Sequence, residues 1–204
     1  MLNLYKTLLK AYGRRGWWPT TSDNKRFEII LGAILTQNTS WKQVEKAIAN
    51  LKNNDLISQE AIKKVSLRRL ASLIKPSGYF NQKAKRLKII NQFLEKNKNP
   101  TRDQLLEVNG IGPETADSIL LYAFNQPSFV IDTYTKRIMQ RLGYKEESYG
   151  GLQALFQDNL PNDYKIYNEF HALFVEHAKT YCRKKPLCQK CPLNSRCNYI
   201  KALT

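Results

Sequence analysis

The sequence has few cysteines, few acidic residues and no long apolar run. Its four cysteines all lie between residues 182 and 197, whereas the disulfide framework of a secreted domain distributes cysteines along the chain. The longest apolar stretches, such as residues 27–35, are too short to cross a bilayer. The N-terminus lacks the apolar block and cleavage site of a secretion signal. These absences favour metal ligation over disulfides, exclude a membrane partner and predict a cytoplasmic protein.

Acidic residues are outnumbered by basic ones, 17 against 33, and the formal net charge is +16. An excess of this size, dispersed along the chain, favours a polyanionic partner. A protein that is merely basic, with no such partner, is the alternative on charge alone. The length of 204 residues is sufficient for one large or two small helical lobes with apolar cores.

Apolar residues recur at intervals of three and four, as in Phe27, Ile30, Leu31 and Ile34, and strand-like alternation is not found. We therefore predict an all-α fold of two helical lobes with a DNA-binding cleft. Turn-forming residues separate the expected helices. Apart from the stretches around residues 27–35 and 44–51, these helices cover residues 58–74, 83–96, 101–108, 113–124, 133–142, 149–159 and 163–180.

A short segment around residues 105–116 has the pattern of two helices joined by a tight glycine turn. Thr101 and Gln104 fit a capping box that starts the first helix, and Pro113 suits the first position of the second. Gly110 and Gly112 can adopt positive φ and allow a ligand to approach the backbone closely. The N–H groups at the second helix start suit a DNA phosphate. A simple tight turn is the alternative interpretation.

With these motifs in view, the chain resembles the endonuclease III superfamily of DNA glycosylases. In that superfamily a helix-hairpin-helix is followed by a Gly/Pro-rich loop and an essential aspartate; here the pattern is Gly110-Ile111-Gly112, then Pro127, then Val130-Ile131-Asp132-Thr133. The resemblance implies a helical domain at 24–129 with the hairpin at about 101–124. It implies a second domain formed by 1–23 plus 130–204.

The resemblance assigns catalysis to Asp132, whose carboxylate would stabilise the positive charge that develops on the sugar and orient the attacking water. Asp132 also precedes a helical run, so a helix N-cap is the alternative role, and the two roles are compatible. Bifunctional members carry a lysine nucleophile two residues after the last hairpin glycine, where this chain has Glu114. A carboxylate cannot form a Schiff base, which predicts a monofunctional enzyme. Glu114 also complements the helix dipole.

Within the superfamily the chain resembles the 3-methyladenine DNA glycosylase branch in the blocks around residues 17–19, 31–39, 76–87 and 112–117. The resemblance implies a base pocket of Trp18, Pro19 and Trp41, with Trp17 and Glu114 nearby. It implies that Gln37, with Asn38 beside it, fills the gap left by the flipped nucleotide. Core anchoring is the alternative for the tryptophans, and a simple helix C-terminus for Gln37. Indole faces attract cationic alkylated bases.

The cysteine pattern Cys182-x5-Cys188-x2-Cys191-x5-Cys197 resembles the iron-sulfur loop of endonuclease III, although the first spacing there is usually one residue longer. We expect a 4Fe-4S cluster on these four residues. Zinc is the alternative, but structural zinc sites commonly use two close cysteine pairs and this chain has one. The loop would present Arg183, Lys184 and Lys185 to DNA. His171 and His177 have no cysteine at ligand spacing and are read as ordinary helix residues.

The sequence thus predicts a monomeric, monofunctional DNA glycosylase in base excision repair that acts on double-stranded DNA with a damaged, alkylated base. It would associate with the nucleoid in a prokaryote. One alternative is a bifunctional glycosylase/AP lyase for oxidised pyrimidines or mismatches; 8-oxoguanine repair is also open, as is a non-catalytic DNA-binding iron-sulfur protein. One run of basic residues is expected either to contact DNA phosphates or to form a solvent-facing helix surface. It consists of Lys83, Lys85, Arg86 and Lys88.

Overall fold

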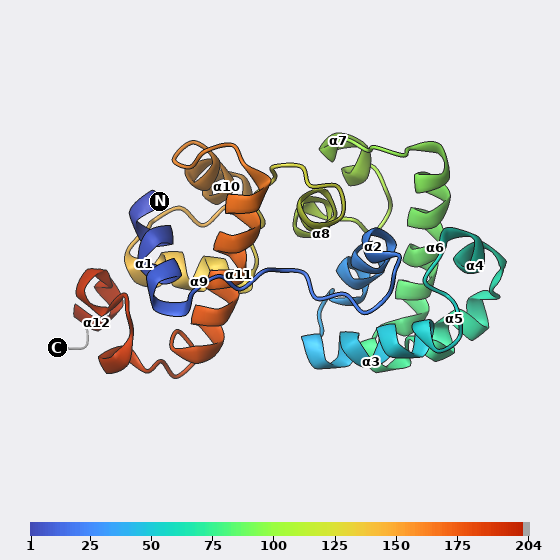
Figure 1. Cartoon of the computed structure of the whole chain (residues 1–204), viewed down its shortest axis with the longest axis horizontal. Helices are drawn as coiled ribbons and strands as arrows, with labels where there is room; N and C mark the ends of the chain where they lie inside the picture. The colour runs from blue at the N-terminus through green and yellow to red at the C-terminus, as the bar shows by residue number, and fades with distance from the viewer. Residues whose placement is uncertain (202–204) are drawn as a thin grey trace. The chain divides into compact units, whose positions relative to one another are not determined.

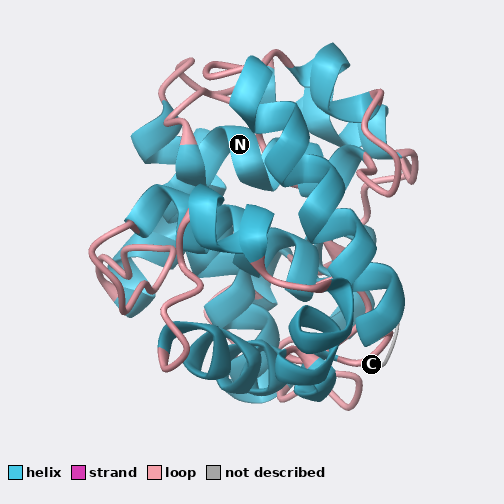
Figure 2. Cartoon of the chain, turned by 90° about the vertical axis from the view of Figure 1, so that its right-hand side faces the viewer, coloured by secondary structure: helices cyan, strands magenta, loops and turns pink. Residues whose placement is uncertain are grey.

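We analysed a computed structural model of the chain, which describes residues 1–201 (Figure 1). The described part consists of helices and loops and contains no strand, as Figure 2 shows. This confirms the all-α prediction. Residues 202–204 of the predicted second domain lie outside the described residues. No helix in the described part is long and apolar enough to span a membrane.

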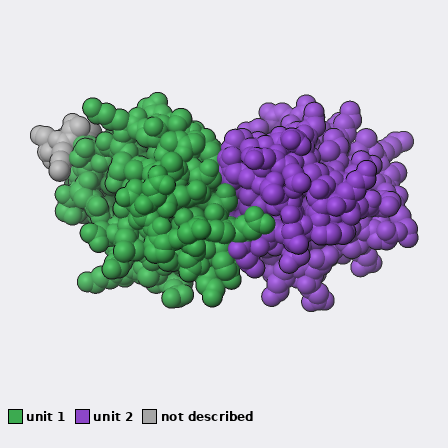
Figure 3. All heavy atoms as spheres, turned by 90° about the horizontal axis from the view of Figure 1, so that it is seen from above, with its two compact units in different colours: residues 1–17, 126–204 green, residues 18–125 purple. Residues whose placement is uncertain are grey.

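The chain divides into two compact units, coloured separately in Figure 3. Unit 1 contains residues 1–17 and 126–204, and unit 2 contains residues 18–125. The boundaries expected from the sequence fall after residues 23 and 129. The predicted cleft between lobes stays a prediction.

Unit 2 is built around one almost completely buried helix, α2 (Lys25–Leu35), in which every residue from Phe27 to Leu35 is buried. Helices α3, α6 and α8 and the π-helical turn η2 contact it. The remaining elements of unit 2 are α3 (Trp41–Lys52), α4 (Gln59–Lys64), α5 (Leu67–Leu73), η1 (Lys75–Ser77), α6 (Phe80–Lys96), α7 (Arg102–Leu106), α8 (Pro113–Ser118) and η2 (Ile119–Ala123).

Unit 1 has an aromatic core along α11 (Tyr164–Thr180), which packs against α1 and α9. Phe129 and Phe156 stack with ring centroids 4.0 Å apart, and Phe170 and Phe174 stack at 4.8 Å. All four rings are buried, and aromatic side chains contribute large apolar areas to a core. Its other elements are α1 (Leu2–Tyr12), α9 (Thr133–Leu142), α10 (Tyr149–Gln157), η3 (Cys188–Lys190), η4 (Asn194–Arg196) and α12 (Asn198–Lys201).

Two helix predictions were wrong in detail. The single helix expected at 58–74 is two helices, because Ser66 interrupts it and caps α5 by accepting a hydrogen bond from the Arg69 N–H. The N-terminal helix α1 was not predicted; Leu4 and Leu8, one turn apart, are its two buried residues. Four positions is the helical spacing, so a signal for this helix was present in the sequence.

Candidate active site and nucleic-acid interface

The predicted hairpin is present in unit 2. Thr101 and Gln104 form the predicted capping box at the start of α7. Pro113 occupies the first turn of α8, as expected. Gly110 has φ of 85°, and an added Cβ there would lie 2.5 Å from Arg86 Nε, so both backbone conformation and space require glycine.

The other two hairpin residues behave differently from the prediction. Gly112 is not in the positive-φ region; its φ is −95° and it is the N-cap of α8. It is exposed, and the position of an added Cβ has no atom within 4 Å. Ile111 is only 6% exposed, and its N–H donates to the Val108 carbonyl at 3.0 Å. Ile111 therefore maintains the turn, and the DNA contact that the hairpin resemblance implies for it stays a prediction, whereas Gly112 leaves the helix start accessible.

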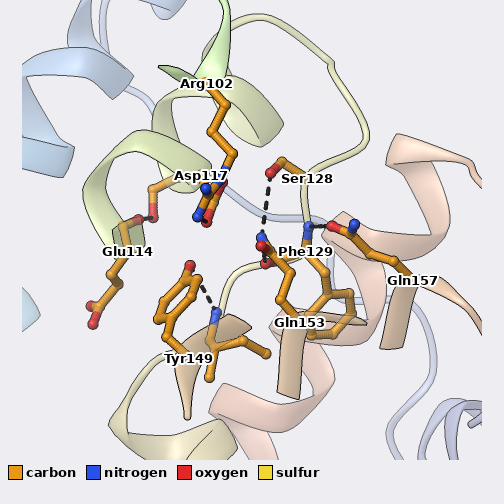
Figure 4. Close-up of polar contacts among 10 residues, drawn as sticks. Arg102, Glu114, Asp117, Ser128, Phe129, Tyr149, Gln153 and Gln157 are labelled. Carbon is orange, nitrogen blue, oxygen red and sulfur yellow. Dashed lines mark hydrogen bonds and ion pairs between the residues drawn. The ribbon is translucent and has the colours of Figure 1, made fainter. Parts of the chain in front are cut away.

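A partly buried ion pair connects the two hairpin helices. Arg102 Nε and Nη2 lie 2.8 and 3.1 Å from the two carboxylate oxygens of Asp117, which is fully buried (Figure 4). This two-point geometry fixes both distance and orientation. On the next turn Ser118 donates to the Glu114 carbonyl at 2.7 Å, while Glu114 itself is exposed.

Gln37 lies in the turn between α2 and α3, where the sequence placed it. Its Nε2 donates to the Gly110 carbonyl and to Thr115 Oγ1, both at 3.0 Å, and its Oε1 accepts from Arg86 Nη1. Asn38 follows in the left-handed region, with φ of 53°, and is exposed. Asparagine tolerates this conformation better than most residues. The structure therefore brings Gln37 to the hairpin and leaves Asn38 at the surface.

Trp18, Trp41 and Tyr122 form an aromatic cluster in unit 2. The Trp18 and Trp41 rings meet edge to face at 5.1 Å, and Trp18 and Tyr122 are tilted at 5.2 Å. Trp41 Nε1 donates to Glu45 Oε1 at 2.9 Å. Trp18 packs on Gly32, where an added Cβ would lie 3.0 Å from Cζ2. Trp18 and Trp41 are thus together, as the predicted base pocket requires.

The segment after Trp18 is held by a buried carboxylate. Glu28, only 3% exposed, accepts from the Thr21 N–H at 2.9 Å and the Ser22 N–H at 2.7 Å. Pro19 lies in this segment and is exposed. Trp17 falls in unit 1, where the Lys179 ammonium lies 5.8 Å from its ring centroid. The place predicted for Trp17 beside the base pocket stays a prediction.

The buried segment that precedes Asp132 in unit 1 is held at several points by side chains of α10; Figure 4 shows Tyr149, Gln153 and Gln157 around this segment. Gln157 Oε1 accepts from the Phe129 N–H at 3.0 Å, and Gln153 Nε2 donates to the Phe129 carbonyl at 2.8 Å. The Ile131 N–H donates to the Tyr149 hydroxyl at 3.4 Å. These bonds satisfy the backbone of an irregular segment and fix the residue that follows it.

The Asp132 carboxylate is the N-cap of α9, which confirms the structural role considered for it. Oδ1 accepts from the Thr135 N–H at 2.7 Å, and Oδ2 lies 3.6 Å from His171 Nε2. Burial raises the pKa of the Asp132 carboxyl, whereas the His171 imidazole and the hydrogen bonds with Thr135 lower it. The lowering effects are larger together, so the pKa lies below its ordinary value. Asp132 is therefore ionised at neutral pH.

The four cysteines of the C-terminal loop line one small pocket, together with His177 and Tyr181. Cys182 is buried and the others are half-buried. His177 Nε2 lies 3.7 Å from Cys191 Sγ. Within residues 1–201, no three side chains of His, Cys, Asp or Glu converge tightly enough to hold a single metal ion. Four thiols in one loop are a donor set of the kind that binds iron-sulfur clusters or zinc as thiolates.

Arg141 of α9 anchors this loop. Its guanidinium donates to the Arg183 carbonyl at 2.7 Å and the Lys184 carbonyl at 3.2 Å, and Nη1 lies 3.4 Å from Cys182 Sγ. The side chains of Arg183, Lys184 and Lys185 are all exposed, as expected for cations that meet a polyanion.

Sequence reasoning missed three contributors. His171 was read as an ordinary helix residue, yet it faces Asp132. Lys83, expected to touch phosphates or face solvent, is 1% exposed and donates to the Leu35 and Ser77 carbonyls at 2.8 and 2.7 Å. Arg86, from the same basic run, binds Gln37. For Lys83 a signal existed, because it shares one helical stripe with Leu87, Ile90 and Leu94.

Comparisons with known proteins agree with this architecture. The chain is 49% identical to the protein named "Putative DNA repair glycosylase MJ1434" of Methanocaldococcus jannaschii, over 90% of this chain and 89% of that protein. It is similar to the H. pylori 3-methyladenine DNA glycosylase MagIII bound to 1,N6-ethenoadenine, with a TM-score of 0.76 and 34% identity over 87% of this chain and 95% of that one.

A non-covalent endonuclease III–DNA complex shares the fold, with a TM-score of 0.86 and 21% identity over 99% of this chain and 95% of that one. The family described as "HhH-GPD superfamily base excision DNA repair protein" matches residues 31–162. The chain therefore belongs to the HhH-GPD superfamily, the endonuclease III-like DNA glycosylases of base excision repair.

Proposed function

We propose that this protein is a monofunctional DNA glycosylase that hydrolyses the N-glycosidic bond of alkylated bases, of the 3-methyladenine type, in double-stranded DNA. The observation that carries the proposal is the Asp132 carboxylate, which is ionised and held in one orientation by Thr135 and His171. A fixed negative charge stabilises a sugar that becomes positive as the base departs.

Unit 2 supplies the parts that bind DNA and receive the base. The exposed start of α8 at Gly112 suits a backbone phosphate. Trp18 and Trp41 offer electron-rich indole surfaces, which attract a cationic base by ~0.5–2 kcal/mol beyond stacking. The similarity to a 3-methyladenine glycosylase with a bound etheno base supports the same substrate class here. Alkylation also makes the base a good leaving group, so a strong general acid is not required.

Monofunctional chemistry is supported by Glu114, which stands where bifunctional relatives carry the lysine nucleophile and is exposed on α8. Lys83 has a pKa lowered to about 8 by burial and by Arg86, as an amine nucleophile needs. Its burial and its two carbonyl partners make it a poor candidate for attack on a sugar. Hydrolysis would leave an abasic site.

We also propose a 4Fe-4S cluster held by Cys182, Cys188, Cys191 and Cys197. Four thiols around one zinc ion would lie about 3.8 Å from each other, given Zn–S bonds of about 2.3 Å. In this protein the four cysteines line one pocket, and their spacing contains one close pair, Cys188 and Cys191, instead of the two pairs common in structural zinc sites. When bound, the cluster would cross-link the loop and keep its exposed cations in place. Iron and sulfide analysis, with visible absorbance, separates this cluster from zinc.

The test of function is an excision assay on duplexes that each carry one damaged base, followed by alkaline cleavage at abasic sites. We expect release of 3-methyladenine or a related alkylated base. Excision of thymine glycol or mismatched thymine without release of alkylated bases would overturn the substrate class.

A bifunctional glycosylase is the second candidate, because endonuclease III of Thermotoga maritima is 31% identical over 86% of this chain. Borohydride reduction during the reaction decides between the two. A covalent protein–DNA adduct would refute monofunctional hydrolysis, and its absence, alongside base release, supports it.

A further inference from the structure

Gln37 belongs to a hydrogen-bonded network in unit 2 that joins three segments distant in sequence. Its amide donates to the Gly110 carbonyl and the Thr115 hydroxyl of the hairpin, and it accepts from Arg86 of α6. The α2–α3 turn, the hairpin and α6 therefore meet at one side chain.

The orientation of the Gln37 amide follows from its partners. A guanidinium has only donors and a backbone carbonyl only accepts, so Oε1 must face Arg86 and the NH₂ group must face Gly110. Both N–H donors are then used, one by Gly110 and one by Thr115. Without Arg86, Oε1 would lose its hydrogen-bond donor and only the Gly110 carbonyl would select this orientation.

Arg86 is itself held in place. Its aliphatic stem and Nε pack on Gly110 so closely that no Cβ would fit there. Three residues earlier on α6, Lys83 donates to the Leu35 carbonyl, two residues before Gln37. The same helix thus fixes both the end of α2 and the side chain that follows it.

We propose that Arg86 is a positioning residue that acts through Gln37, holding its amide against the hairpin so that it is already ordered when a nucleotide leaves the stack. This inference rests on the proposed function and on the role that the sequence resemblance implies for Gln37, which is to fill the space left by the flipped nucleotide. The network links the hairpin, which is proposed to bind a DNA phosphate, to Gln37, which is proposed to fill the space left by the flipped nucleotide. Preorganisation of this kind removes the entropy cost of ordering a long side chain on binding.

A direct phosphate contact by Arg86 is the competing explanation, and the two differ in measurable ways. A cation that binds a phosphate contributes to the affinity for any duplex and to the salt dependence of that affinity. Removal of one such cation makes the slope of log affinity against log salt concentration shallower by about 1. A positioning role affects only DNA with a gap to fill and leaves the salt slope unchanged.

The experiment compares binding to an intact duplex with binding to the same duplex carrying a tetrahydrofuran abasic analogue, over a series of salt concentrations. The variants are Arg86→Met, Gln37→Ala, the double variant and Lys85→Met. Lys85 is the matched control, because it is an exposed cation on the same helix. Circular dichroism and thermal melting verify folding. Arg86→Lys, which keeps a donor, serves if the methionine variant does not fold.

We expect the wild type to bind the abasic duplex more tightly than the intact duplex. In Arg86→Met the ratio of these two affinities should fall by ~10-fold or more, which is the effect expected from loss of a hydrogen bond with a charged donor. Gln37→Ala should show the same loss, and the double variant no further loss. Arg86→Lys should fall between, and Lys85→Met should keep the wild-type preference. Affinity of Arg86→Met for intact duplex and its salt slope should match the wild type.

Equal weakening on both duplexes with a reduced salt slope would overturn the proposal in favour of a phosphate contact. The proposal would also be overturned if the double variant lost the preference for abasic DNA by the product of the two single-variant factors, because Arg86 would then not act through Gln37. Base release is measured on the same preparations. A wild type that prefers abasic DNA and releases no base would refute the proposed function and leave the positioning role intact.

Discussion

Replacement of Lys83 by methionine provides a quantitative test of the core of unit 2. Lys83 is 1% exposed, and its ammonium donates to the carbonyls of Leu35 and Ser77. Burial, assisted by Arg86, lowers the pKa of Lys83 from 10.5 to about 8. Methionine preserves most of the apolar stem and removes the titratable group.

The sign of the pH effect follows from the direction of the shift. Below pH 8 the lysine is protonated in both the folded and the unfolded chain. Between pH 8 and 10.5 the unfolded chain keeps the proton that the folded chain has lost, so the free energy of unfolding rises by about 1.4 kcal/mol per pH unit. From pH 7 to pH 10 this single group adds about 2.5 kcal/mol to wild-type stability.

The assay is urea unfolding of wild type and Lys83→Met at pH 7, 8, 9 and 10. We expect the stability difference between the two proteins to shift in favour of wild type by about 2.5 kcal/mol across this range. For Lys85→Met, which changes an exposed lysine, the free energy of unfolding should change with pH as it does in the wild type. If the free energies of unfolding of Lys83→Met and wild type changed equally with pH, the lowered pKa of a buried Lys83 would be refuted.

Three further predictions concern packing and the base pocket. Gly32→Ala places a Cβ 3.0 Å from Trp18 Cζ2, so it should displace the indole and shift tryptophan fluorescence; an unchanged spectrum would contradict the packing. Phe156→Ala should cost about 3–5 kcal/mol in denaturant unfolding, and a loss below about 1 kcal/mol would argue against its stacked position. Glu28→Gln should weaken the bonds from Thr21 and Ser22 and speed exchange of those amides, whereas equal protection would show that another group holds the loop.

Local signals predicted the parts of the fold that depend on neighbouring residues. The capping box at Thr101, the proline at the start of α8 and the cap at Asp132 all appeared as expected, because each involves residues within a few positions. The apolar period of α2 likewise predicted a buried helix. These features follow from backbone hydrogen bonding and side-chain periodicity alone.

Contacts between residues distant in sequence could not be predicted from local sequence patterns. Gln37 meets Arg86 and Gly110, which are 49 and 73 positions away, so its network depends on how α2, α6 and the hairpin pack. His171 looked like one more residue of a buried helix, and its approach to Asp132 depends on the packing of α11 against α9. Lys83 was misread because a basic run suggested a surface, although its place in the apolar stripe indicated burial.

The central claim is that the Asp132 carboxylate promotes base release. Its most direct test is single-turnover excision from an alkylated duplex by wild type and by Asp132→Asn, because asparagine caps a helix as well as aspartate does and preserves the fold. The account predicts that the asparagine variant binds DNA and melts like the wild type but releases the base at least ~100-fold more slowly. A variant that excises within a few-fold of the wild-type rate would contradict it.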